Sequence, residues 1–229
     1  MVRLIGLTGA LDLAKRLVDE NEGNLKNHEN YINHIRCVYG ISLEVLENIF
    51  SKYPRIPLPV GEISIAAVLH DIGRPLNKNQ IFHELRGARY IEQNGLRDKI
   101  SDSLEYAFRI AQTFRSHGFV YEYWHDAECL DLRVEFEPLD SSLLVPRNWN
   151  EAIVTYSDMS AGSNERISVE DRMNELFLRY ENNPIFQNDT VLRVSKVAND
   201  RILRLARKVE ALEHGKLSEE EILRFGFLK

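Results

Sequence analysis

The sequence AAVLHDIGRP, residues 66–75, decides how the rest of the chain is interpreted. Its apolar residues leave one or more faces of a helix without charge, so it predicts a buried helix that ends at Gly73 and Pro75. His70 and Asp71 are adjacent ionisable groups at the end of this helix. Burying such groups is unfavourable unless a metal ion or partner charges satisfy them. The pair is therefore a candidate functional site, although an isolated His–Asp pair is also typical of an ion pair at a helix end.

The composition is that of a globular protein. Of 229 residues, 44% are hydrophobic and 28% are charged, which is enough apolar material for one sizeable domain. The net charge of -6 argues against a dedicated nucleic-acid binder, because such proteins usually carry a basic excess. A small anionic substrate remains compatible with this charge, because a metal ion or a local cluster of arginines reverses the sign inside a pocket.

The cysteine content and the N-terminal sequence predict a cytoplasmic protein. Cys37 and Cys129 are the two cysteines of the chain, so we expect no disulfide framework and a reducing compartment. The apolar residues at positions 1–7 form too short a run, too soon followed by charge, for a signal peptide. No apolar stretch of the sequence approaches the length that spans a membrane.

Apolar residues recur at helical spacing through most of the chain. Besides the central stretch, this pattern predicts helices over residues 11–20, 31–53, 82–94, 102–114, 151–157, 169–180 and 191–214, with a short acidic helix after them. Asn183 and Pro184 break the chain before the last long helix. We therefore expect an all-α domain over residues 1–180 and a helical C-terminal extension, residues 185–229, that packs on it.

Residues 119–149 lack the helical period and are rich in aromatic, acidic and proline residues. Within them, LDLRVEFE (residues 130–137) alternates apolar and charged residues, which is typical of a strand. We therefore expect a small β-like insert that can cover a site. Its aromatic residues either stack on a nucleobase or pack against the domain; they are Tyr121, Tyr123, Trp124 and Phe136.

Five predicted elements supply six side chains of the kind that binds metal ions: His34, His70, Asp71, His83, His117 and Asp158. Imidazoles and carboxylates together are ligands for Mn, Fe, Co, Ni or Zn. Six ligands suit two ions better than one, with Asp71 as a bridging carboxylate. Two alternatives stay open: one of His83 and His117 only lines the pocket, or Asp158 caps the N-terminus of a helix.

The order of these residues resembles the HD-domain superfamily of metal-dependent phosphohydrolases. INHIRCVYGIS (residues 32–42) resembles the first-histidine helix, AAVLHDIGRP the HD helix and IVTYSDMSAG (residues 153–162) the closing segment. The family commonly has alanine where this chain has Ser157. FHELRGARYI (82–91) and FRSHGF (114–119) match the extra histidines of the dinuclear branch. The resemblance covers about residues 28–172.

The resemblance implies a dinuclear metal site and a phosphohydrolase activity. His34, His70, Asp71 and Asp158 would bind one ion; Asp71, His83 and His117 would bind the other. Fe, Mn, Co, Ni, Zn and Mg are all compatible ions, and a metal-activated hydroxide would attack phosphorus. The expected substrate is nucleotide-like, since the branch resembles diadenosine-tetraphosphate hydrolases. Hydrolysis of cyclic dinucleotides is not expected, because Gly118 stands where those enzymes have a second histidine and their GYP signature is missing.

Arg74 stands where many members of the family have a lysine, and it is the first choice for a phosphate contact. With Asp71 it forms the expected catalytic pair. Weaker candidates for phosphate binding are Arg86, Arg89, Arg115 and Arg166. The alternative for Arg74 is a cap at the C-terminal end of its helix, where the helix dipole favours a cation.

Two other functions stay open at the level of sequence. The same six ligands resemble those of di-iron oxygenases built on the HD fold, and spacing does not separate the two chemistries. A catalytically silent domain that binds a nucleotide is the third possibility. The basic face of residues 193–208 is either solvated or the contact of a homodimer.

Overall fold

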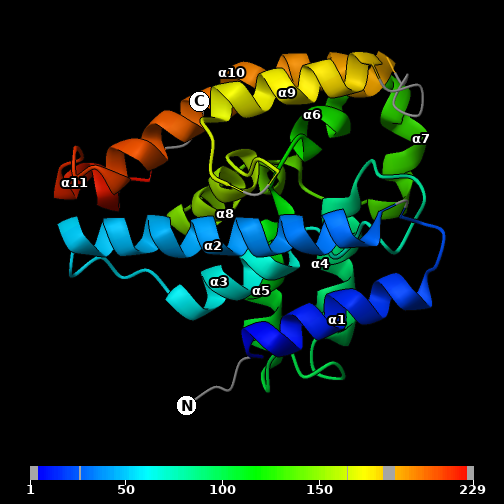
Figure 1. Cartoon of the computed structure of the whole chain (residues 1–229), viewed down its shortest axis with the longest axis horizontal. Coiled ribbons are helices and arrows are strands. Elements are labelled where there is room, and N and C mark those ends of the chain that lie inside the picture. The colour runs from blue at the N-terminus through cyan, green and yellow to red at the C-terminus, as the bar shows by residue number, and fades with distance from the viewer. Residues whose placement is uncertain (1–4, 26, 164, 183–188, 226–229) are drawn as a thin grey trace.

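The computed structural model of the chain describes residues 5–25, 27–163, 165–182 and 189–225. Within these residues the structure consists of α-helices and short 3-10 turns, with no β-strand (Figure 1). The prediction of an all-α protein is confirmed. The predicted break at Asn183 and Pro184 lies outside the described residues, so the division into residues 1–180 and 185–229 stays a prediction.

The predicted helices are all present, with shifted ends. The first half of the chain forms α1 (Leu7–Glu20), α2 (His28–Lys52), α3 (Val60–Leu69), α4 (His83–Asn94) and α5 (Leu104–Arg115). The second half forms α6 (Val120–His125), α7 (Leu130–Arg133), α8 (Trp149–Met159), α9 (Val169–Asn182), α10 (Asp189–Glu213) and α11 (Glu219–Leu223). Over the described part of the chain, no helix has the length and apolar content that a bilayer crossing requires.

The helix α3 lies at the centre of the molecule. Every residue from Glu62 to Leu69 is buried, as expected for a helix that is apolar on all faces. It packs against α1, α2, α5 and α8. The chain then turns tightly, because the Ile72 amide donates to the Leu69 carbonyl and the Arg74 amide to the Asp71 carbonyl. This turn places the His–Asp pair inside the helical bundle.

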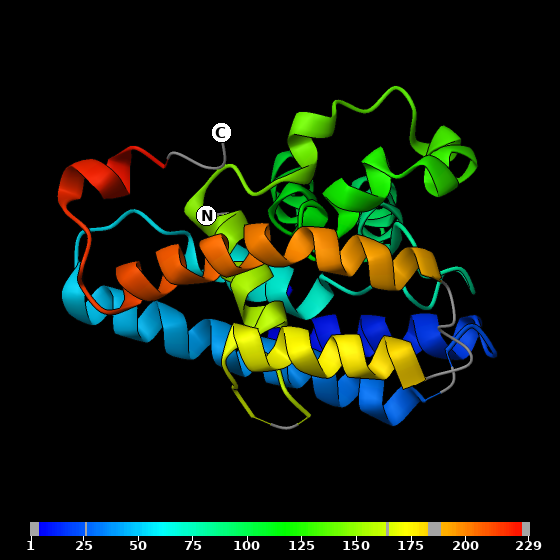
Figure 2. The same ribbon diagram turned by 90° about the horizontal axis from the view of Figure 1, so that it is seen from above.

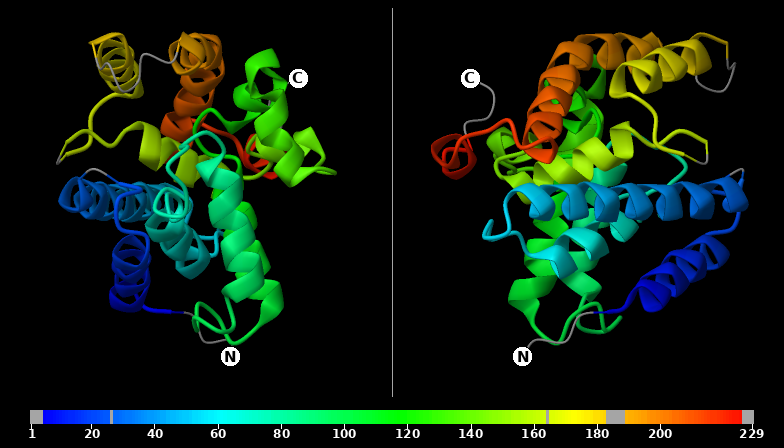
Figure 3. Two further views of the ribbon diagram at one scale, coloured as in Figure 1. Left: turned by 90° about the vertical axis from the view of Figure 1, so that its right-hand side faces the viewer. Right: turned by 60° about the vertical axis from the view of Figure 1, so that its left-hand side comes forward.

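The C-terminal helices form one face of the molecule. In Figure 1, α9 and α10 lie above α2, and Figure 2 shows them side by side. Figure 3 (left) shows α10 between α9 and residues 119–149. Arg193 pairs with Asp126 at 3.0 Å and Arg201 with Glu122 at 2.6 Å, so these two arginines of α10 bind residues 119–149. Arg204 and Arg207 of the same basic face are exposed, as expected for a solvated face.

The predicted β-like insert at residues 119–149 is wrong. These residues form α6, α7 and 3-10 turns at Ala127–Cys129, Val134–Phe136 and Ser141–Leu144. In the alternating sequence 130–137, Leu132 and Phe136 are four residues apart, which also places them on one helical face. Leu130 and Val134 are 43% and 63% exposed, so the alternation does not produce a buried strand face. A strand would also need a ladder partner, and the described residues contain no strand that could supply one.

Candidate metal centre

The six predicted ligands meet at the end of α3, and five elements carry them. His34 comes from α2, His70 and Asp71 from the turn after α3, His83 from the first turn of α4, His117 from the turn after α5 and Asp158 from α8. Asp158 lies inside α8, so the alternative role as an N-cap is wrong. Tyr31 supports the turn, because its hydroxyl donates to the Asp71 carbonyl at 3.2 Å.

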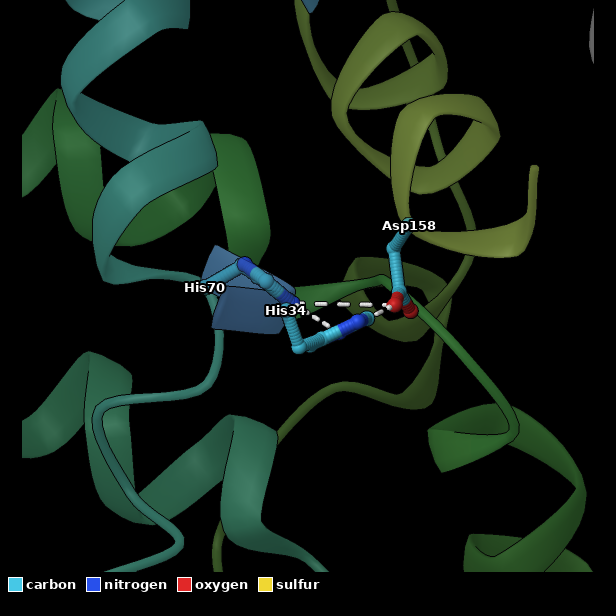
Figure 4. Close-up of side chains that lie close together, drawn as sticks. All are labelled: His34, His70 and Asp158. Carbon is cyan, nitrogen blue, oxygen red and sulfur yellow. Dashed lines mark hydrogen bonds and ion pairs between the residues drawn. The ribbon is translucent and has the colours of Figure 1, made fainter. Parts of the chain in front are cut away.

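One set of ligand atoms lies on the α2 and α8 side of the centre. His34 Nε2 lies 3.1 Å from Asp158 Oδ1, and His70 Nε2 lies 3.6 Å from the same oxygen. The two imidazole nitrogens are 3.3 Å apart. Figure 4 shows the three side chains converging from separate elements. These three ligand atoms are within 4.8 Å of one another, so together they can hold one metal ion.

Asp71 joins this set to a second one. Its Oδ2 lies 3.7 Å from Nε2 of both His34 and His70. Its Oδ1 lies 2.9 Å from His83 Nε2 and 3.5 Å from His117 Nε2. Each carboxylate oxygen therefore faces a different pair of histidines, which is the arrangement of a bridging ligand.

Backbone carbonyls select the tautomer of three histidines. Nδ1 of His70 donates to the Ala67 carbonyl at 2.8 Å, and the same contact occurs from His83 to Gln80 at 2.8 Å and from His117 to Phe114 at 2.6 Å. With the proton on Nδ1, the Nε2 lone pair of each ring points to the centre, which is the form that binds metal.

Several buried polar atoms of the centre have no hydrogen bond. They are Asp71 Oδ1, His83 Nε2, His117 Nε2 and Glu84 Oε2. Unpaired buried polar groups are rare in proteins and are unfavourable unless an ion or water satisfies them. The donor set, the tautomers and these unpaired atoms all fit a bound divalent metal ion.

The electrostatics of the centre keep its carboxylates ionised. Burial raises the pKa of Asp71, but the charges of Arg74, His70 and His83 hold that pKa well below its usual range. Burial likewise raises the pKa of Asp158, and hydrogen bonds and charges from His34 and His70 lower it further than burial raises it. The two carboxylates, Asp71 and Asp158, can stay ionised in a buried site only if positive charge lies nearby.

Arg74 belongs to the centre. Its Nε lies 2.5 Å from Asp71 Oδ2, and its side chain is 34% exposed. Burial lowers the pKa of Arg74, but the Asp71 carboxylate raises it above its usual value, so the group stays charged. The position just past the end of α3 also agrees with the helix-capping alternative. The side chains of His34 and Asp158 are 20% and 13% exposed, whereas those of His70 and Asp71 are 0% and 2% exposed. The centre is therefore open on the side of His34 and Asp158, and the partly exposed Arg74 lies at this open side.

Protein acceptors occupy the other four arginines. Arg86 donates to the carbonyls of Asn79 and Ile81 at 2.8 and 2.9 Å. Arg89 donates to the Glu135 carbonyl, Arg115 pairs with Glu92, and Arg166 binds Glu213, Glu44 and Tyr156. These contacts hold neighbouring helices, loops and turns together, and phosphate binding by Arg86, Arg89, Arg115 or Arg166 gains no support from the structure.

The aromatic residues of the insert pack around Phe82, the residue before His83. Tyr123, Trp124 and Phe136 lie at ring-centroid distances of 6.2, 6.0 and 5.7 Å from Phe82, edge to face. Phe82 has a φ of 63°, a left-handed conformation that this packing maintains. The insert therefore supports the start of α4 and, through it, the position of His83.

Comparisons of the chain with protein-family models, with curated proteins and with solved structures found no match. The fold and the centre define an all-α protein with a buried cluster of histidines and carboxylates that can hold metal ions.

Proposed function

We propose that the chain is a metal-dependent phosphohydrolase of the HD-domain type, with a dinuclear site that acts on a phosphate ester or anhydride. The observation that carries this proposal is the position of Asp71, whose two oxygens face two separate pairs of histidines. A single-metal site does not need the second pair. The order of the six ligands along the chain, which resembles that superfamily, supports the same function.

Each residue has a defined role in this proposal. His34, His70, Asp71 and Asp158 would hold one ion, and Asp71, His83 and His117 would hold the other. Bound divalent ions supply Lewis-acid activation of the phosphoryl group and a water of lowered pKa. The hydrogen bonds from Nδ1 to backbone carbonyls orient His70, His83 and His117, so their ligand atoms are preorganised before an ion binds.

Arg74 is the residue that binds the phosphate in this proposal. A guanidinium presents two parallel N–H donors to phosphate oxygens and stays charged at all physiological pH values. Contact with Asp71 orients the side chain of Arg74, while its partial exposure leaves donors for a ligand. We propose that the substrate is a small phosphorylated molecule, nucleotide-like, which enters from the side of His34 and Asp158.

The experiment that tests this function combines metal analysis with a substrate panel. The purified chain is analysed for bound metals and then assayed with Mn, Co, Ni, Zn, Mg or Fe(II) on nucleoside mono-, di- and triphosphates, dinucleoside polyphosphates and generic phosphate esters. We expect metal-dependent release of phosphate or nucleotide. A metal-loaded protein that hydrolyses nothing but consumes dioxygen would be an oxygenase. A loaded protein that does neither but binds a nucleotide would be a silent binding domain.

A further inference from the structure

Glu84 is a buried carboxylate beside the centre for which the six-ligand set has no role. It follows His83 in the first turn of α4 and is 1% exposed. Its Oε2 lies 3.3 Å from His83 Nδ1, but that nitrogen gives its proton to the Gln80 carbonyl at 2.8 Å. Glu84 Oε2 therefore accepts no hydrogen bond.

The surroundings of Glu84 leave room for the carboxylate on the side of His117. Gly118 follows His117 with a φ of +61°, and a Cβ there would lie 3.2 Å from Glu84 Oε1. A side chain at position 118 would crowd the carboxylate as well as strain the backbone. Glu84, His83 and His117 offer ligand atoms that all lie within 4.8 Å of one another.

A structural role explains Glu84 poorly. An acidic residue in the first turn of a helix is stabilised by the helix dipole, but this effect is small and usual at exposed positions. Complete burial of a carboxylate oxygen without a hydrogen bond is much more unfavourable than the dipole is favourable. Glu84 is 1% exposed and offers a ligand atom close to those of His83 and His117, so it faces the centre rather than the surface.

We propose that Glu84 is a third carboxylate ligand of the centre and completes the metal position formed by His83 and His117. This inference rests on the proposed function, because it requires that the centre binds metal. Each position then has two histidines and two carboxylates, with Asp71 shared. The carboxylates of Asp71, Asp158 and Glu84 would then offset three of the four positive charges that two divalent ions bring.

The test compares Glu84→Gln with wild type and with Glu62→Gln. Glu62 is a matched control because it is a buried glutamate on α3 that pairs with Arg109 at 3.0 Å, away from the ligand set. Zinc binding to each metal-free chain is measured by calorimetry, and zinc content by elemental analysis. We expect two equivalents for wild type and Glu62→Gln, and a second equivalent weakened at least ~10-fold in Glu84→Gln.

The outcomes separate this inference from the proposed function. A wild-type chain that binds no zinc overturns both. A wild-type chain with two equivalents, matched in affinity by Glu84→Gln, overturns the role of Glu84 alone. A crystal structure of the zinc-loaded wild-type chain decides the matter if the variant does not fold. A Glu84 oxygen within about 2.2 Å of an ion supports the inference, and a Glu84 without any contact to an ion overturns it.

Discussion

A Cβ atom on Gly73 would lie 1.9 Å from the carbonyl oxygen of His83. The turn after the His–Asp pair therefore crosses the first turn of α4 backbone to backbone, and the same Cβ would lie 2.6 Å from the Gly87 nitrogen. The sequence predicts Gly73 as the end of a helix. The structure adds a second role, since this crossing sets the distance between Asp71 and His83.

The first prediction concerns this crossing. Gly73→Ala places a methyl group against rigid backbone, so we expect a loss of about 3 kcal/mol in the free energy of unfolding, and weaker metal binding as His83 moves. The control is Gly40→Ala in α2, where a Cβ meets nothing within 4 Å. That change should stabilise the chain by about 0.5–1 kcal/mol. Chemical denaturation followed by circular dichroism measures both, and equal stability of the two variants would contradict the close approach.

The second prediction concerns the bridging carboxylate. Asp71→Asn keeps the size of the side chain but removes its charge, so it weakens both metal positions together. We expect metal affinity and hydrolysis to fall more than ~100-fold. Asp98→Asn is the matched control, because the side chain of Asp98 is 4% exposed and pairs with Arg16 at 3.0 Å. Metal content and turnover are measured on both variants, and full activity of Asp71→Asn would refute the bridging role.

The third prediction distinguishes the role of Arg74 in substrate binding from the role of Arg166 in stability. Arg74→Ala should lower kcat/KM by roughly 10- to 100-fold, since charge-assisted hydrogen bonds contribute about 1.5–3 kcal/mol. Metal content should not change, and Arg74→Lys should recover part of the loss. Arg166→Gln should instead lower the melting temperature, because it leaves the buried Glu213 without its 2.5 Å partner. If Arg74→Ala affects only stability, the arginine is a helix cap and the phosphate contact is wrong.

The helices can be predicted from the sequence because they depend on the local spacing of apolar residues. The six-ligand cluster can be predicted because its members occur in a particular order along the chain. Apolar spacing decides which face of a helix is buried, and α3, which is apolar on all faces, has to be central. His34, His70 and Asp158 are separated by long stretches of chain, and the prediction that they meet depends on the resemblance of their order to that of a known superfamily. The structure brings them together, while their role as metal ligands stays a prediction.

Other features depend on partners that a linear pattern does not contain. The sequence 130–137 fits both an alternating strand and an i, i+4 helical face. No strand among the described residues can pair with it, and the segment is helical. Arg166 looks like a free cation until Glu213, 47 residues further along the chain, is placed beside it. Glu84 in the first turn of α4 resembles an ordinary dipole-stabilising residue, and only its burial shows otherwise.

The last prediction concerns pH and metal binding. Burial lowers the pKa of His117, but the Asp71 carboxylate 3.5 Å away and the charges of Glu84 and Asp158 raise it from 6.5 to about 9. In the metal-free chain this group holds its proton more tightly when folded. Its contribution to stability is complete below pH 6.5 and is lost as the pH rises through about 9. A metal ion needs the neutral ring, so it displaces that proton at neutral pH.

Zinc affinity should therefore rise between pH 6.5 and 9, by up to ~10-fold per pH unit for one displaced proton. His117→Gln should remove this dependence together with the second equivalent of metal. His214→Gln, at an exposed position after α10, should behave as wild type. Calorimetry in buffers of different ionisation enthalpy counts the protons released on binding. Release of no proton by wild type at pH 7.5 would show that His117 is already neutral and would contradict the charge assigned to it.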